Sequence, residues 1–256
     1  LRRFAKEMGI HALAIQPPDA DREMDASIVG QGGFLDTVNG VCDSTYLIPL
    51  EGGYDAVERR FDSEIAKKLR QAAKRGLAVT EGGENDLEEF FELMASTCRR
   101  QDGVKPNPAD VPSMLRLWRS FGSGKRIRLF LAEDGGKRIA GQLCIQFGDR
   151  VTLWKKGWNG EAGDKRPNEM LMAHALKRAC EDGFKLADLA SLHRAIALRL
   201  IAGEELTPEQ KASRHAFNLR FGGSAKLLSP ARILAPHAWM TPCLRFAAYL
   251  HGLRNH

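Results

Sequence analysis

The stretch RIRLFLAEDGGKRIAGQLCIQFGDRVTLWKKGW, residues 126–158, contains three largely apolar runs that are separated by two short turn signals. The runs RIRLFLAE, RIAGQLCIQFG and RVTLWKKGW have the length and composition of β-strands. Asp134-Gly135-Gly136 and Gly148-Asp149 supply residues that tight hairpin turns prefer. We therefore expect a three-stranded meander in the middle of the chain.

Helical patterns flank this meander on both sides. Two helices are expected before it, at about 86–101 and 110–121, and a third is expected after it with Asn168 as its N-cap. The apolar residues 184–191 then predict a buried strand, and a helix that ends at Phe221 precedes a short last strand. The predicted order is α-α-β-β-β-α-β-α-β, which places the chain in the α/β (α+β) class.

The most regular helical pattern covers residues 55–76 and ends at Gly76. Five apolar residues form one stripe along it, and three basic residues share another face. The apolar stripe consists of Val57, Phe61, Ile65, Leu69 and Ala72, and the basic face of Lys67, Arg70 and Lys74.

The polar, glycine-rich segment EGGEN, residues 81–85, follows this helix and predicts a domain boundary. We accordingly expect a first domain over 1–82, which is incomplete, and a second, complete domain over 83–230. Residues 231–256 are expected to form a C-terminal helical tail.

Composition narrows the function classes. The net charge of +6 suits an anionic ligand such as a coenzyme, a tRNA or a lipid headgroup. The five cysteines form no C-x-x-C pair, and the seven histidines have no ligand spacing, so neither a metal site nor a disulfide framework is predicted. No apolar run reaches the length of a spanning helix, so a cytoplasmic protein is expected, with residues 231–250 as a candidate peripheral contact to the inner membrane.

Four segments together resemble the FemAB-like transferases. TYLIPL (45–50) with FDSEIAKKLRQAAKRGLAV (61–79) is similar to the strand and basic crossing helix that end their first domain. LFLAEDGGKRIAGQL (129–143) is similar to their central hairpin, and PNEMLMAHALKRACEDGFKLADLA (167–190) to the helix and strand after their substrate loop. FNLRFGG (217–223) resembles their closing Phe-Lys-x-x-Phe-Gly motif.

The resemblance implies two GNAT-like acyltransferase domains in tandem, each with a mixed central sheet that is flanked by helices. It implies transfer of an acyl or aminoacyl group from acyl-CoA or aminoacyl-tRNA to an amine, without a metal. Peptidoglycan and polysaccharide precursors are the acceptors that the family implies.

Three residues are candidate catalytic groups. Asn218 occupies the place of the lysine in the closing motif, and it can donate a hydrogen bond but carries no charge. Asp188 lies in an apolar strand, where a carboxylate needs either a partner or a role. Lys155 and Lys156 point to opposite faces of one strand, and we expect one of them, Lys155, to face the site.

The loop 159–168 is the candidate site for an anionic donor. Its glycines allow close backbone approach, its basic residues supply charge, and the following helix offers free N–H groups. The candidate donor-binding residues are Gly160, Gly163, Lys165, Arg166 and Asn168, with Arg220 as a further cation.

The basic face Lys67, Arg70 and Lys74 is a candidate binding surface for tRNA or an acceptor, although a solvated helix face, whose late basic residues complement the helix dipole, is the favoured explanation. Asn218 in place of lysine also leaves an alternative function. In that alternative the chain is a catalytically weakened GNAT-like module that binds a tRNA or a lipid-linked precursor. A third reading is a nucleic-acid binder without transfer chemistry.

Overall fold

The computed structural model describes residues 1–17, 21–36, 42–101, 104–122 and 126–254. The chain forms two compact units. One comprises residues 1–45, 191–206 and 225–256, and the other comprises residues 46–190 and 207–224.

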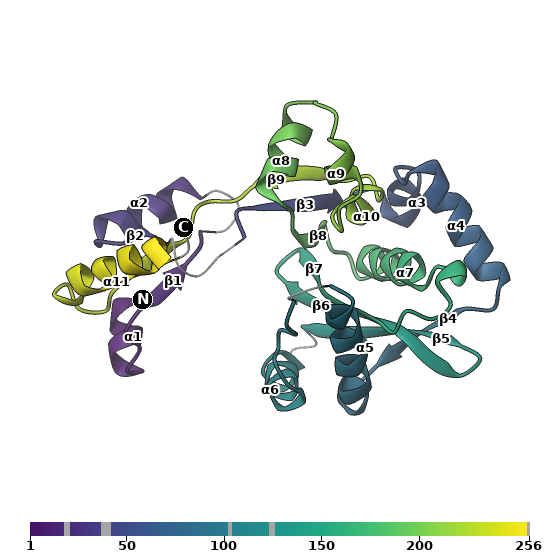
Figure 1. The fold of residues 1–256 in the computed structure, drawn as a ribbon, viewed down its shortest axis with the longest axis horizontal. Helices are drawn as coiled ribbons and strands as arrows, with labels where there is room; N and C mark the ends of the chain where they lie inside the picture. The colour runs from purple at the N-terminus through teal and green to yellow at the C-terminus, as the bar shows by residue number, and fades with distance from the viewer. Residues whose placement is uncertain (18–20, 37–41, 102–103, 123–125, 255–256) are drawn as a thin grey trace. The chain divides into compact units, whose positions relative to one another are not determined.

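The larger sheet is mixed and has seven strands in the order β4-β5-β6-β7-β8-β3-β9, of which all but β9 lie wholly or mainly in the second unit (Figure 1). Strands β4 to β7 pair antiparallel, and β8 pairs parallel to β7, so the predicted meander is confirmed as β5-β6-β7. The strands are β3 (Ser44–Pro49), β4 (Ala78–Gly82), β5 (Ile127–Asp134), β6 (Lys137–Phe147), β7 (Arg150–Trp158), β8 (Leu186–Ser191) and β9 (Ser224–Leu227).

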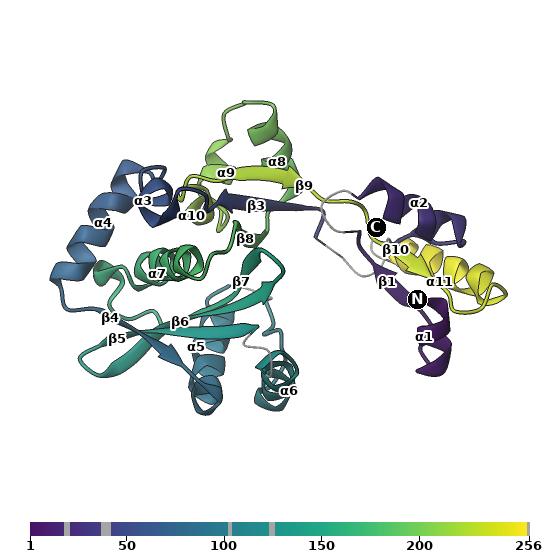
Figure 2. The same cartoon turned by 180° about the vertical axis from the view of Figure 1, so that it is seen from behind.

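Helices cover both faces of this sheet. Figures 1 and 2 show α7 on one face of β4–β6 and α5 and α6 on the opposite face. Phe90, Leu93 and Met94 of α5 form the core on that second face, together with sheet residues such as Leu129 and Leu143. The helices of this unit are α3 (Gly53–Glu58), α4 (Ser63–Lys74), α5 (Leu87–Arg99), α6 (Val111–Gly122), α7 (Pro167–Glu181), α9 (Pro208–Lys211) and α10 (Ala216–Leu219), with 3-10 turns η2 (Glu84–Asp86) and η3 (Gly163–Lys165).

The helix predicted over 55–76 is two helices, α3 and α4. The break falls at Asp62, whose side chain accepts a hydrogen bond of 2.8 Å from the N–H of Glu64 and thereby caps a new helix. The predicted apolar stripe is nevertheless buried along both helices, because the break preserves its orientation toward the core. Its exposed fractions are 0% for Val57, Ile65 and Ala72 and 7% for Phe61 and Leu69.

The first unit contains a small antiparallel sheet in the order β1-β10-β2. Arg232 on β10 forms a two-pronged ion pair with Asp25 on α2, with both N–O distances at 2.8 Å. Its elements are α1 (Arg2–Glu7), β1 (Leu13–Ile15), α2 (Arg22–Gly30), β2 (Phe34–Leu35), α8 (Arg194–Ile201), β10 (Arg232–Leu234) and α11 (Met240–Arg254).

The structure divides the chain at other points than the predicted boundaries at 82/83 and 230/231. Strand β4 pairs with β5 along its whole length, so residues 78–82 belong to the larger sheet. Residues 232–234 form strand β10 before the C-terminal helix begins, so the segment after 230 is not wholly helical. Both differences arise from pairing between strands that are far apart in the sequence, which the local composition used for the prediction does not reveal.

Candidate functional site

Strands β7 and β8 run side by side for only part of their length. They pair through Arg150↔Leu186, Val151↔Ala187 and Thr152↔Asp188, and no pairs follow, although both strands continue. The part of β7 that does not pair with β8 still pairs with β6, and that pairing is irregular. Cys144 on β6 pairs with Leu153, whereas its neighbour Leu143 pairs with Lys155. One extra residue is therefore inserted at Trp154, as in a β-bulge.

The bulge decides which way the following side chains point. Leu153 is opposite Cys144 and Lys156 is opposite Gln142, so Leu153 and Lys156 lie on the same face although they are three residues apart. In a regular strand Leu153 would share its face with Lys155. The extra residue thus brings Lys156 to the α7 face of the sheet, at the place where β8 has separated.

Lys156 is enclosed at its charged end. Its Nζ donates a hydrogen bond of 3.1 Å to Asn218 Oδ1 and lies 4.4 Å from the centroid of the Phe217 ring. The residue as a whole is half-buried, but its ammonium group is surrounded by protein, and this burial lowers the pKa of Lys156 to about 8. The negative charge of Glu169 on α7 offsets part of that shift.

The closing segment holds Asn218 in place through its neighbours. Asn218 Nδ2 donates to the carbonyl of Leu189 on β8 at 3.4 Å. Phe221 is fully buried, with its ring centroid 5.1 Å from that of Phe61. Gly222 has φ +72°, and a Cβ there would lie 2.3 Å from the carbonyl oxygen of Arg60, so glycine is required. Helix α10 ends at Leu219, two residues before the predicted end at Phe221, and the Phe217 ring lies against the ammonium of Lys156.

Gln142, the cross-strand neighbour of Lys156, is a buried polar residue that the sequence did not single out. Its side-chain amide donates a hydrogen bond of 2.9 Å to the carbonyl of Lys155, which lies at the bulge. Its Oε1 is buried without a hydrogen-bond partner in the described part of the chain. A buried acceptor without a partner is costly, so this oxygen is available to a bound N–H group.

Lys155 lies away from Asn218, contrary to its predicted place in the site. Its Nζ is 4.5 Å from the centroid of the Trp154 ring, which packs against the α5–α6 core. Burial lowers the pKa of Lys155, and Cys98 on α5 is the electrostatic neighbour that opposes this shift. The bulge exchanges the faces of the two lysines, and a chemical role for Lys155 stays a prediction.

Asp188 finds structural partners. Its Oδ1 accepts a hydrogen bond of 2.9 Å from the N–H of Ala190, a residue with φ +55°, and its Oδ2 lies 3.6 Å from the guanidinium of Arg150. These contacts account for a mostly buried carboxylate at the last paired position of β8. A chemical role for Asp188 stays a prediction.

The loop 159–168 is less basic than its sequence indicated. Lys165 forms an ion pair of 2.6 Å with Asp134, and Asp164 forms one of 3.0 Å with Arg75 at the C-terminal end of α4. Gly160 has φ +93°, and Gly163 lies where a Cβ would be 3.3 Å from the Trp158 ring. The glycines are thus explained by packing and backbone conformation, and binding of an anion by this loop stays a prediction.

The N-terminus of α7 differs from the prediction. Arg166, with φ +61°, is the residue before the helix, and Pro167 occupies its first position, so Asn168 lies inside the helix and does not cap it. Proline favours this start because its fixed φ suits the first helical turn and its missing N–H would have no partner there. Arg166 Nε is buried without a hydrogen-bond partner in the described part of the chain.

The other predicted cations separate into two groups. Arg220 forms ion pairs at the start of α4, with Glu64 and, at 3.6 Å, with Asp62. Its charge is therefore already partnered, and a part in donor binding stays a prediction. Lys67, Arg70 and Lys74 on α4 are exposed and form no ion pair with any described residue. Their binding of tRNA or an acceptor stays a prediction.

Comparison with known proteins gives a consistent fold. A family model described as an acetyltransferase (GNAT) domain matches residues 59–192, a little more than half of the chain. The crystal structure of FemX is similar over 91% of this chain and 74% of that one, with 14% identity and a TM-score of 0.69. The structure of L-PGS from Bacillus licheniformis matches 92% of this chain and 72% of that one, with 10% identity and a TM-score of 0.52. A conserved protein of unknown function from Bacteroides thetaiotaomicron VPI-5482 matches 92% and 73%, with 12% identity and a TM-score of 0.55. No curated protein matches the chain.

Within the described ranges, no helix combines the length and the apolar character that crossing a bilayer requires.

Proposed function

Because the chain belongs to the GNAT acetyltransferase domain family, we propose that it transfers an acyl group from an activated donor to an amine, with Lys156 and Asn218 at the centre of the reaction. The observation that carries this proposal is the enclosed Lys156 ammonium, 3.1 Å from Asn218 Oδ1. The closing motif of the FemAB-like transferases has a lysine where this chain has Asn218. Here strand β7 supplies a cation to the same place.

The reaction forms one bond and breaks another. The nitrogen of the acceptor amine attacks the acyl carbonyl carbon, an N–C bond forms, and the bond from that carbon to the donor's sulfur or oxygen breaks. The amine loses one proton, and the departing thiolate or alkoxide gains one. In the intervening state negative charge develops on the carbonyl oxygen.

Lys156 has the properties that stabilise this charge. With a pKa of about 8, it is about ten times more often ammonium than amine at pH 7. Asn218 and the Phe217 ring hold the ammonium in a protein-enclosed environment, where it interacts more strongly with an oxyanion than it would in water. The unpartnered Gln142 Oε1 lies on the same face of the sheet and would accept from an N–H of the donor or the acceptor.

The donor is either acyl-CoA or aminoacyl-tRNA, and the acceptor that we propose is an amine of a peptidoglycan or polysaccharide precursor. The ion pair between Lys165 and Asp134 weakens the case for a diphosphate in the loop 159–168. The exposed cations Lys67, Arg70 and Lys74 on α4 favour a larger polyanion such as tRNA.

The test offers the chain radiolabelled acetyl-CoA and radiolabelled aminoacyl-tRNA separately, each with a lysine-containing UDP-linked muropeptide and with an aminohexose. Transfer of label to either acceptor supports the proposal and identifies the donor. Lys156→Met should slow transfer by about 100-fold or more, and the matched variant Lys105→Met, at an exposed position, should retain it. Saturable donor binding without transfer would overturn the proposal and favour the alternative of a binding module.

A further inference from the structure

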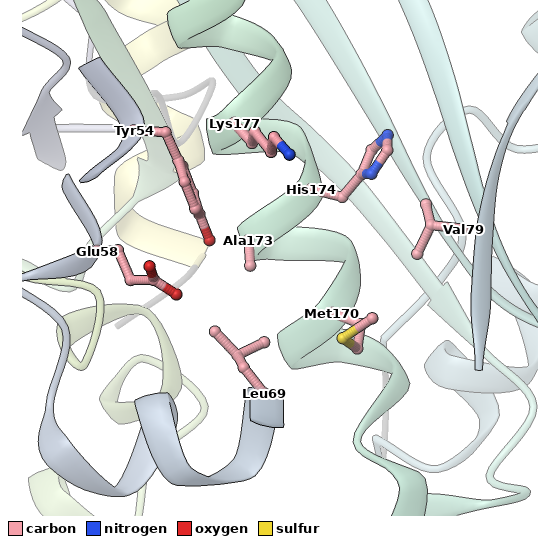
Figure 3. A pocket seen from close by; sticks show the side chains of 8 residues that line it. All are labelled: Tyr54, Glu58, Leu69, Val79, Met170, Ala173, His174 and Lys177. Atoms are coloured by element: carbon pink, nitrogen blue, oxygen red, sulfur yellow. The ribbon is translucent and has the colours of Figure 1, made fainter. Parts of the chain in front are cut away.

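A pocket of about 300 Å³ lies between α3, α4, β4 and α7 (Figure 3). Four of its lining residues are apolar, and four are polar residues of α3 and α7, of which Glu58 and Lys177 are exposed. The apolar residues are Leu69, Val79, Met170 and Ala173, and the polar residues are Tyr54, Glu58, His174 and Lys177.

The polar lining residues carry one full charge of each sign. Figure 3 shows the Glu58 carboxylate and the Tyr54 hydroxyl on one side of the pocket, with the Lys177 amine on the neighbouring helix. Neither Glu58 nor Lys177 forms an ion pair or side-chain hydrogen bond with a described residue, so both are available to a ligand. Opposite charges beside one apolar surface match a molecule that has both charges and an apolar body.

Tyr54 and His174 add uncharged groups. Burial raises the pKa of Tyr54, and the charge of Glu58 raises it further, so the phenol stays a hydrogen-bond donor. Burial lowers the pKa of His174, with Arg178 and Lys177 acting in the same direction and Glu181 and Glu81 opposing them, which favours the neutral imidazole. Glu58 and Lys177 are therefore the two charged residues that line the pocket.

We propose that this pocket binds a free α-amino acid with an apolar side chain. Glu58 would bind its ammonium group, Lys177 would bind its carboxylate, and the side chain would lie on Leu69 and Ala173. The volume is at the lower end of the range of about 300–1,000 Å³ that small-molecule pockets span, which fits a ligand of this size.

The pocket shares no lining residue with the Lys156 site, so the inference goes beyond the proposed function and does not depend on it. The two regions nevertheless use α7 together. Glu169 acts electrostatically on Lys156, and the next residue, Met170, lines the pocket.

The test titrates the chain with L-leucine and follows the methyl signals of Met170 and Leu69 by NMR, with binding heat as a second measure. We expect saturable shifts at both methyl groups. Isoamylamine and 4-methylpentanoate, which each lack one charge, should bind about tenfold more weakly or worse, because each loses a charge-assisted hydrogen bond. L-Lysine should also bind more weakly, because its second ammonium group would meet the apolar surface.

Glu58→Gln and Lys177→Gln should each weaken L-leucine by a similar factor, whereas Glu88→Gln and Lys105→Gln, at exposed positions of the same unit, should not. A thermal melt of each variant confirms that it is folded. Absence of saturable L-leucine binding, or equal binding by the two variants and their controls, overturns the proposal. Neither result bears on acyl transfer, which is measured separately.

Discussion

The Nζ of Lys156 lies 3.1 Å from Oδ1 of Asn218, and this hydrogen bond joins strand β7 to a short helix 62 residues further along the chain. Lysine and asparagine here form a pair in which one residue supplies the charge and the other orients it. The arrangement places a cation beside Asn218, the position at which the closing motif of the FemAB-like transferases has a lysine. The pair should therefore affect the rate of acyl transfer and the free energy of unfolding, and exchanging its two residues should test their coupling.

Removal of the Lys156 ammonium should lower kcat for acyl transfer by about 100-fold or more, the usual cost of losing one donor to an oxyanion. Lys156→Arg should retain more activity than Lys156→Met, because it keeps a cation. In the proposed reaction the ammonium form is the active one, so activity should be lost as the pH rises through about 8. Pre-steady-state rates from pH 6 to 10, corrected for titration of the acceptor amine, measure this profile.

The arginine variant provides the control for that assignment. A guanidinium keeps its proton throughout this range, so the alkaline loss near pH 8 should disappear in Lys156→Arg. A loss near pH 8 that persists in this variant would show that another group causes it.

The enclosed lysine should also cost stability. Its folded pKa of about 8 lies below the ordinary value of 10.5, so the unfolded chain binds more protons between these values. The free energy of unfolding should therefore rise as the pH increases from about 8 to 10.5. Below pH 8 the penalty is fully present, and Lys156→Met should be more stable than the natural chain by up to about 3 kcal/mol at pH 7.

Urea denaturation of both proteins at pH 7 and pH 10 measures this difference. The advantage of Lys156→Met should shrink at pH 10, because the lysine is then mostly neutral in the folded chain. An advantage of equal size at both pH values would mean that packing of the methionine, and not the buried charge, causes it.

The sequence predicted much of this fold because its signals are local. The runs between 126 and 158 form the expected strands, and the apolar stripe from Val57 to Ala72 is buried in full. Glycine at 222 is dictated by a positive φ and by the nearby Arg60 backbone, whose close approach the sequence does not reveal.

The choice between Lys155 and Lys156 could not be made from the sequence. Alternation along β7 says only that they point to opposite faces, and the bulge that decides between them depends on the pairing of β6 with β7. The same holds for Gln142, whose burial next to Lys156 follows from cross-strand register. The ion pair of Lys165 with Asp134 likewise joins residues 31 positions apart, so the loop's charge looked more available than it is.

Gly157 should be intolerant of a side chain, because it lies where α5 contacts β7. A Cβ at this position would be 2.6 Å from the Met94 nitrogen and 2.7 Å from the Leu93 carbonyl carbon. Gly157→Ala should destabilise the fold by about 1–3 kcal/mol, since backbone atoms cannot yield as a side chain can. Gly122→Ala at the end of α6 is the control, because its nearest neighbour would be Trp118 at 3.8 Å. Urea midpoints compare the two, and equal midpoints would contradict the close packing.

Exchange of Lys156 and Asn218 tests where the lysine must lie. Either a single lysine at one of the two positions is enough, or the lysine must be at position 156. Asn218→Lys alone places a second ammonium beside Lys156 in an enclosed environment, where like charges repel and desolvation is costly. We expect it to lower kcat by about tenfold and to lower the pKa of one lysine further.

The double variant Lys156→Asn with Asn218→Lys restores a single cation and a single amide, with the lysine in the place that the FemAB-like closing motif gives it. It should recover most of the activity that Asn218→Lys loses, and Lys156→Asn alone should stay inactive. A full double-mutant cycle of kcat/KM measures the coupling between the two positions. Additive effects would mean that the hydrogen bond between β7 and α10 has no part in the reaction, and that the cation acts only through its place on β7.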